Sequence, residues 1–103
     1  MKILITGNRG FVGTETQKFL ESKGHEVIGY DLMDGFDIRD QEQFKNVVMG
    51  LKPDRILHLA AIARFSEADK DPRLAFETNA MGTRNVAYIA GMAHIPVVYS
   101  STG

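Results

Sequence analysis

The sequence contains no cysteine, only three prolines and no apolar run long enough to cross a membrane. Without cysteine, a disulfide framework and a thiol nucleophile are both excluded. The first apolar run, Ile3–Ile5, is too short to serve as the core of a signal peptide. These absences predict a cytoplasmic protein with no membrane segment.

A charge excess of either sign is also missing. Twelve Lys and Arg residues face 13 Asp and Glu residues, the net charge is −1, and the two signs are interleaved. This argues against a nucleic-acid partner or a membrane surface. His25, His58 and His94 are scattered without metal-ligand spacing, so no metal site is predicted and each histidine is interpreted as structural or solvated.

Short apolar segments alternate with longer amphipathic ones along the 103 residues. Ile3–Ile5, Glu26–Tyr30, Arg55–Leu59 and Val97–Ser100 are predicted strands. The alternation predicts one domain over residues 1–103: an α/β fold with a Rossmann-type doubly wound parallel sheet of about four strands, in three α/β/α layers. Residues expected on the buried helix faces are Val12, Thr16, Phe19 and Leu20, then Phe44, Val47, Val48 and Leu51, and finally Leu74, Thr78, Met81, Val86, Ile89 and Ala93.

Capping residues mark where the predicted helices begin and end. Gly24 is expected to stop the first helix, and residues 32–39 are expected to form a loop. Asp40 is a predicted N-cap, with Gln43 as its capping-box partner. Asp71 followed by Pro72 predicts the start of a helix that runs to about Ala93.

Three glycines follow the first strand at Gly7, Gly10 and Gly13. The first permits a tight turn, the second lets a phosphate approach the backbone, and the third lets the helix pack close to the strand. The G-x-x-G-x-x-G spacing differs from the standard G-x-G-x-x-G fingerprint. A strand before it and a helix after it nevertheless favour a pyrophosphate site, to which Phe11 and Val12 at the helix start are also assigned.

Asp31 ends the second predicted strand, eighteen residues beyond Gly13. A carboxylate there accepts hydrogen bonds from ribose hydroxyls and repels a 2′-phosphate, which favours NAD over NADP. Arg9 lies inside the glycine loop and has two interpretations. It is either a solvated side chain or a group that reaches a 2′-phosphate, so NADP stays open as the less favoured cofactor.

Six motifs spread over the whole chain resemble those of the extended short-chain dehydrogenase/reductases, the NAD-dependent epimerase/dehydratase family of nucleotide-sugar enzymes. In chain order, they are Thr6-Gly7-x-x-Gly10-x-x-Gly13, Asp31, Asp37-Ile38-Arg39-Asp40, His58-Leu59-Ala60-Ala61, Asn79-x-x-Gly82-Thr83 and Val97-Val98-Tyr99-Ser100-Ser101-Thr102. Their order and spacing are more specific than any one of them.

The resemblance implies reversible hydride transfer between a nicotinamide and a sugar hydroxyl, with a nucleotide-sugar substrate. It assigns Thr102, with Ser101 beside it, to the catalytic hydroxyl. Asn79 is interpreted either as a hydrogen-bond partner of the backbone or as a cofactor contact. Besides the glycine loop and Asp31, the implied cofactor residues are Asp37, Ile38, Leu59, Ala60, Ala61, Ala63, Asn79 and Ser100.

Two departures from the family pattern leave the function open. The family's Tyr-x-x-x-Lys motif is absent from this sequence, and Ala63 stands where some epimerases place a lysine against the cofactor ribose. The chain is therefore expected to be the cofactor half of such an enzyme and to be inactive by itself. The alternatives are a stand-alone NAD-binding or nucleotide-binding module, an NADP-dependent sugar reductase or epimerase, and a structural or regulatory relic that pairs with another chain. A homo-oligomer is expected, since an incomplete sheet exposes an edge.

Overall fold

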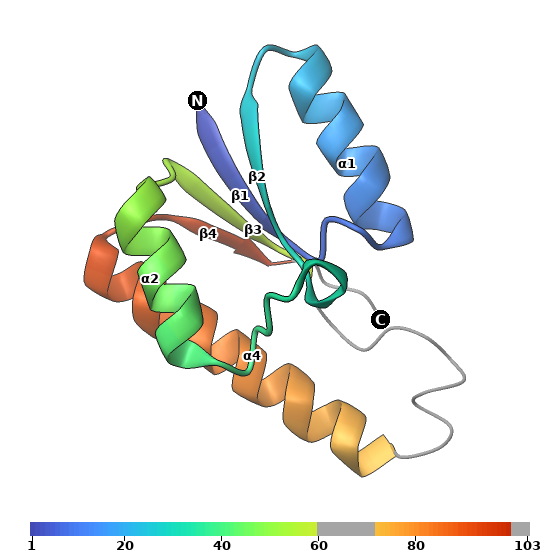
Figure 1. The fold of residues 1–103 in the computed structure, drawn as a ribbon, viewed down its shortest axis with the longest axis vertical. Helices are drawn as coiled ribbons and strands as arrows, with labels where there is room; N and C mark the ends of the chain where they lie inside the picture. Colours follow the sequence, from blue (N-terminus) through green and yellow to red (C-terminus); the bar gives the residue numbers. More distant parts are fainter. Residues whose placement is uncertain (60–71, 100–103) are drawn as a thin grey trace.

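The computed structural model describes residues 1–59 and 72–99. Four parallel strands form one sheet: β1 (Lys2–Thr6), β2 (Glu26–Tyr30), β3 (Arg55–His58) and β4 (Val97–Tyr99). The helices are α1 (Phe11–Ser22), α2 (Gln41–Leu51) and α4 (Pro72–Ala93), with a 3-10 turn, η1, at Leu32–Asp34. Figure 1 shows α1 on one face of the sheet and α2 with α4 on the other. The predicted three-layer Rossmann-type fold is confirmed.

The strand order is β2-β1-β3-β4, which places β1 in the interior of the sheet. Leu4 of β1 pairs with Ile28 of β2 on one side and Ile56 of β3 on the other. This explains why β1 is an uninterrupted apolar run, since both of its faces are covered. The main hydrophobic cluster lies between the sheet and the α2–α4 layer. Its buried members are Leu4, Tyr30, Phe44, Val48, Ile56, Val86, Ile89 and Ala90.

Helix α1 is rotated relative to the sequence-based prediction. Val12 and Phe19 were expected to face the sheet, yet they are 53% and 59% exposed. Gly13 is the buried residue of α1, and its close contact with the Gly7 backbone fixes which side of the helix faces β1. One residue corresponds to about 100° of rotation around a helix, so Val12 and Phe19 point away from the sheet.

The segment between β2 and α2 is more ordered than the predicted loop. It forms η1 and then turns at Gly35, whose φ is +86°. Asp40 is the N-cap of α2 as predicted, because its carboxylate accepts from the Gln43 N–H at 3.0 Å. The other predicted bond of the capping box, from the Asp40 N–H to the Gln43 side chain, is wrong, because the Asp40 N–H donates to the Asp37 carbonyl. The Gln43 side chain turns toward the preceding loop, where it bonds Asp37 and Gly35.

The remaining helix faces and strand ends are close to prediction, with small corrections. Helix α4 spans Pro72–Ala93 and buries Val86 and Ile89 as expected, but Met81 is 41% exposed. On α2, Leu51 is 43% exposed instead of buried, since it lies in the last turn beyond the core. Strand β3 ends one residue early at His58, and β4 is described through Tyr99. Asp71 lies outside the described residues.

In the part of the chain that the structure describes, no helix combines the length and apolar character needed to cross a bilayer. The described sheet has no strand beyond β4, where Val98 and Tyr99 are 57% and 45% exposed. Along α4, Phe76, Tyr88 and Met92 are also largely exposed. Unpaired strand edges and apolar helix faces favour association with another chain.

We therefore predict that the chain forms a dimer or a larger species in solution, measurable by light scattering. Val98→Lys should dissociate it if the β4 edge is used, and Tyr88→Lys if the α4 face is used, because a buried lysine charge opposes either contact. A monomer across the concentration range would contradict this prediction.

Candidate dinucleotide-binding site

The glycine loop turns sharply at the carboxyl end of β1. Gly7 has a φ of +77°, a left-handed conformation that favours glycine, and its N–H donates to the Tyr30 carbonyl at 2.8 Å. That bond ties the loop to the end of β2. The Gly10 N–H then donates back to the Gly7 carbonyl at 3.2 Å. The chain reverses within four residues and enters α1 directly.

Gly10 and Gly13 serve different needs. A Cβ on Gly13 would collide with the Gly7 carbonyl oxygen and lie 2.8 Å from the Asn8 Cα, so the fold itself requires glycine there. A Cβ on Gly10 would meet only the Gly7 oxygen at 3.4 Å, and the φ of Gly10 is an ordinary −74°. Packing and backbone conformation therefore leave room for a side chain at Gly10.

The N-terminus of α1 has no side-chain cap. Gly10 is the N-cap and offers no side chain, and the first turn contains no acidic residue. The first intrahelical bond runs from the Thr14 N–H to the Gly10 carbonyl. Within residues 1–59 and 72–99, the N–H groups of Phe11, Val12 and Gly13 have no hydrogen-bond partner. Three unpaired donors at a helix N-terminus suit an anion such as a phosphate.

Asp31 lies beside this loop, at the end of β2. One of its carboxylate oxygens accepts from the Arg9 N–H at 3.0 Å and the other from the Met33 N–H at 2.9 Å. Asp31 therefore caps η1 and fixes the glycine loop at the same time. The Arg9 side chain is half exposed and lies 3.9 Å from the Asp34 carboxylate, a weak ion pair. The guanidinium is therefore about half accessible to solvent beside the loop.

Sequence reasoning missed Asn8. Its side chain is only 9% exposed, donates to Gln17 at 3.1 Å and occupies the space that a Cβ on Gly29 would fill. The Asn8 Oδ1 atom is buried and has no partner in the described part of the chain. Gly29, between the apolar residues Ile28 and Tyr30 of β2, was the available signal, because a glycine inside a strand often marks a close approach.

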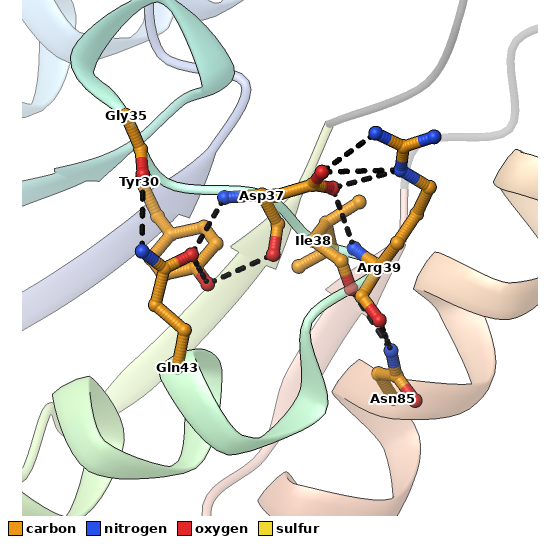
Figure 2. Close-up of polar contacts among 7 residues, drawn as sticks. All are labelled: Tyr30, Gly35, Asp37, Ile38, Arg39, Gln43 and Asn85. Atoms are coloured by element: carbon orange, nitrogen blue, oxygen red, sulfur yellow. Dashed lines mark hydrogen bonds and ion pairs between the residues drawn. The ribbon is translucent and has the colours of Figure 1, made fainter.

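The loop before α2 is held from its inner side, as Figure 2 shows. The Gln43 side chain accepts from the Asp37 N–H at 2.8 Å and donates to the Gly35 carbonyl at 3.0 Å. The buried Tyr30 hydroxyl lies 3.1 Å from the Asp37 carbonyl and from Gln43. Burial, followed by the nearby Asp40 and Asp37 charges, raises the pKa of Tyr30, so the hydroxyl stays a proton donor.

Asp37 forms a forked ion pair with Arg39, in which Nη2 lies 2.7 Å from Oδ2 and Nε lies 3.0 Å from Oδ1. The Arg39 N–H also donates to Oδ1 at 2.9 Å. The hydrogen-bonded guanidinium lowers the pKa of the Asp37 carboxyl, so it is ionised at neutral pH. The Ile38 N–H has no hydrogen-bond partner among the described residues.

Helix α4 contacts the same loop. Asn85 is 2% exposed and donates to the carbonyls of Ile38 and Arg39 at 3.0 and 3.1 Å (Figure 2). Its oxygen accepts from Gln41 at 3.3 Å. A Cβ on Gly82, one turn earlier, would lie 2.8 Å from a methyl carbon of Ile38. The glycine at position 82 of the predicted motif is therefore explained by the Ile38 side chain, which leaves no room for a Cβ there.

At the end of β3, His58 is buried and lies 2.7 Å from Thr6 through Nδ1 and 3.3 Å from Thr83 through Nε2. Burial lowers the pKa of His58, so the ring is neutral at neutral pH. The Leu59 N–H donates to the carbonyl and the hydroxyl of Thr6, each at 3.0 Å. These bonds join the carboxyl ends of β1 and β3, and both ring nitrogens of His58 lie within hydrogen-bond distance of a threonine hydroxyl.

The described residues bring most of the predicted site to one edge of the sheet. The glycine loop, Asp31, Asp37–Ile38 and Leu59 all follow the carboxyl ends of β1, β2 or β3, and Asn79 lies half-buried on α4. The other predicted residues lie outside the described residues. They are Ala60, Ala61, Ala63, Ser100, Ser101 and Thr102.

The contrast between the two loop glycines gives a stability test. Gly13→Ala should lower the free energy of unfolding by roughly 1–3 kcal/mol, the usual cost of overpacking. Gly10→Ala should cost less than about 1 kcal/mol, since only N-cap preference is lost. Urea denaturation of both variants measures the difference, and equal losses would contradict the close contact between Gly13 and Gly7.

Comparison with known proteins places this geometry in a family. The family described as the RmlD substrate binding domain matches residues 1–103. UDP-glucose 4-epimerase of Rhizobium meliloti is 32% identical over 114 residues, which cover 97% of this chain and 35% of that protein.

Two solved structures are similar to the fold. UDP-glucose 4-epimerase of Thermus thermophilus, in complex with NAD, matches with a TM-score of 0.88 and 28% identity over 99% of this chain and 38% of that one. dTDP-4-dehydrorhamnose reductase of Bacillus anthracis, in complex with NADP, matches with a TM-score of 0.83 and 32% identity over 95% and 35%. The chain spans about a third of the length of these relatives. It belongs to the RmlD substrate binding domain family, within the extended short-chain dehydrogenase/reductases of the epimerase/dehydratase type.

Proposed function

We propose that this chain is the NAD-binding part of a nucleotide-sugar epimerase, dehydratase or reductase. The observation that carries the proposal is the uncapped N-terminus of α1, whose Phe11, Val12 and Gly13 N–H groups are free among the described residues, next to the Asp31 carboxylate. A pyrophosphate would take the helix donors. The adjoining ribose would then lie toward the end of β2.

Gly10 supports the pyrophosphate assignment. Neither packing nor backbone conformation excludes a side chain there, so its glycine is best explained by the close approach of a ligand. Gly7 and Gly13, by contrast, are required by the turn and by helix packing. Of the three loop glycines, Gly10 is therefore the one that most directly indicates a bound ligand.

Asp31 supports NAD over NADP. Its two backbone hydrogen bonds hold the carboxylate at the end of β2, where it would accept from the adenosine ribose hydroxyls and repel a 2′-phosphate. NADP remains the second candidate because Arg9 is half exposed beside Asp31 and the similar reductase of Bacillus anthracis is in complex with NADP.

The loop before α2 supports an adenine site. The Asp37 carboxylate is an acceptor with lone pairs beyond those used by Arg39, and the Ile38 N–H is a free donor in the described part of the chain. Adenine presents the complementary pair, an amino donor and the N1 acceptor. Asp37 and Ile38 are thus suited to hydrogen-bond the base.

In an enzyme of this type, the bound nicotinamide supplies reversible hydride transfer at a sugar hydroxyl. We propose that Thr102, with Ser101 beside it, hydrogen-bonds that hydroxyl, and that Leu59, Ala60, Ala61, Ala63, Asn79 and Ser100 line the nicotinamide half of the site. The Tyr-x-x-x-Lys motif is absent from these 103 residues, so the chain alone is expected to bind without turnover. A nucleotide-binding module without catalysis is the alternative, and a cytoplasmic location stays a prediction.

Calorimetric titration with NAD and NADP tests the cofactor assignment. NAD should bind more tightly than NADP. Asp31→Asn keeps the size and one acceptor of the side chain but removes its charge. It should reduce the preference for NAD over NADP by about fivefold or more, because unit charges 4 Å apart in water repel by roughly 1 kcal/mol.

The companion variant Gly10→Ala should keep the fold and weaken both cofactors, because its methyl group occupies the phosphate approach. A folded chain that binds neither cofactor would refute the proposed function. An unchanged preference in Asp31→Asn would remove Asp31 as the ribose ligand.

A further inference from the structure

The loop before α2, residues 35–40, is held from the protein interior at successive peptide groups. The Asp37 N–H is bonded by Gln43, and the Asp37 carbonyl is contacted by Tyr30 and by the Asp40 N–H at 3.0 Å. These contacts come from β2 and α2, the elements that flank the loop in sequence. The next peptide, between Ile38 and Arg39, is instead held from α4, more than forty residues away along the chain.

That peptide links Asn85 to the Asp37 carboxylate. Asn85 Nδ2 donates to the Ile38 carbonyl, and the N–H of the same peptide, on Arg39, donates to Asp37 Oδ1. Because a peptide group is planar, fixing its carbonyl also fixes the direction of its N–H. The second Asn85 bond, to the Arg39 carbonyl, holds the following peptide as well.

Buried asparagine is expensive unless its groups are paired, and Asn85 uses both of its polar atoms. At 2% exposure it bonds the loop through nitrogen and Gln41 of α2 through oxygen. A leucine would fill the same space and serve the helix equally well. What the amide provides, and leucine would not, is the pair of hydrogen bonds to the Ile38 and Arg39 carbonyls.

Gly82 makes the second contact between α4 and this loop. The Ile38 side chain packs against the Gly82 Cα, in the space that a Cβ on residue 82 would occupy. Gly82 is therefore the position where α4 admits the Ile38 side chain, three residues before the amide that holds the Ile38 carbonyl. Together the two contacts set both the side chain and the peptide of Ile38.

We propose that Asn85 is a positioning residue for cofactor recognition: from α4 it orients the Ile38–Arg39 peptide, and through it the Asp37 carboxylate, for reading the adenine edge. The inference rests on the proposed function, since it assumes that Asp37 and Ile38 contact the base. Asn85 is only 2% exposed, so it would act through the loop and not by contact with the cofactor. Its effect should therefore appear in base selectivity, not only in stability.

The test compares NAD with nicotinamide hypoxanthine dinucleotide by calorimetry. Hypoxanthine reverses the donor and acceptor of the adenine edge, so a carboxylate and an N–H fixed in place should reject it. The wild-type chain should prefer NAD, and Asn85→Leu should reduce that preference by about tenfold, the scale of one hydrogen bond to a charged group. Hydrogen exchange at the Arg39 N–H should accelerate in the ligand-free variant.

Gly82→Ala provides a second variant in case Asn85→Leu does not fold. It improves helix propensity while displacing Ile38, so it should lose base selectivity without losing the fold. Gly91→Ala, on the same helix with nothing within 4 Å of the added Cβ, is the matched control and should keep wild-type selectivity.

Binding to the wild-type chain tests the adenine assignment, and the variants test the role of Asn85. A wild-type chain that binds no NAD, or does not discriminate between the two bases, overturns the adenine assignment and the inference with it. A wild-type chain that discriminates, with Asn85→Leu and Gly82→Ala both unchanged, leaves the proposed function standing and overturns the role of Asn85.

Discussion

The close approach of Gly13 to the Gly7 backbone is the contact on which the candidate site depends. It brings the first turn of α1 against the end of β1, where a side chain on residue 13 would collide. It fixes the rotation of α1, so Val12 and Phe19 face outward while the N-terminus of the helix opens at the edge of the sheet. The same contact leaves three helix N–H groups available to an anion in the described structure.

Around that contact, each neighbouring strand end is tied to the loop by a short bond. The Gly7 N–H reaches the last residue of β2, Asp31 bonds the Arg9 N–H, and Thr6 joins β1 to His58 and Leu59 of the β3 end. Among the described residues, the buried side-chain polar atoms are paired except for Asn8 Oδ1, whereas the N–H groups of Phe11, Val12, Gly13 and Ile38 are not. Such an arrangement is pre-organised for a ligand, because binding requires little further ordering of the backbone.

Much of this could be predicted from the sequence because local rules decide it. The apolar runs predicted the strands, and the glycine spacing predicted the loop after β1. Pro72 predicted the start of α4, and Asp40 predicted the N-cap of α2. The errors arose where tertiary contacts override local pattern. The apolar residues of α1 suggested one buried face, but the Gly13 contact selects another. The Gln43 side chain bonds Asp37 and Gly35 in the loop before α2 instead of the Asp40 N–H. Asn85 could not be recognised because its partners lie more than forty residues away, and the signal for Asn8 was only indirect, in the glycine at position 29.

We propose that one NAD molecule spans both parts of the site, with its pyrophosphate at the α1 N-terminus and its adenine at the loop before α2. Amide chemical-shift mapping with NAD tests it most directly, since each N–H is observed separately. We expect the largest shifts at Phe11, Val12, Gly13 and Ile38, whose N–H groups are unpaired in the described structure. Saturable binding that shifts other amides and leaves these four unchanged would contradict it.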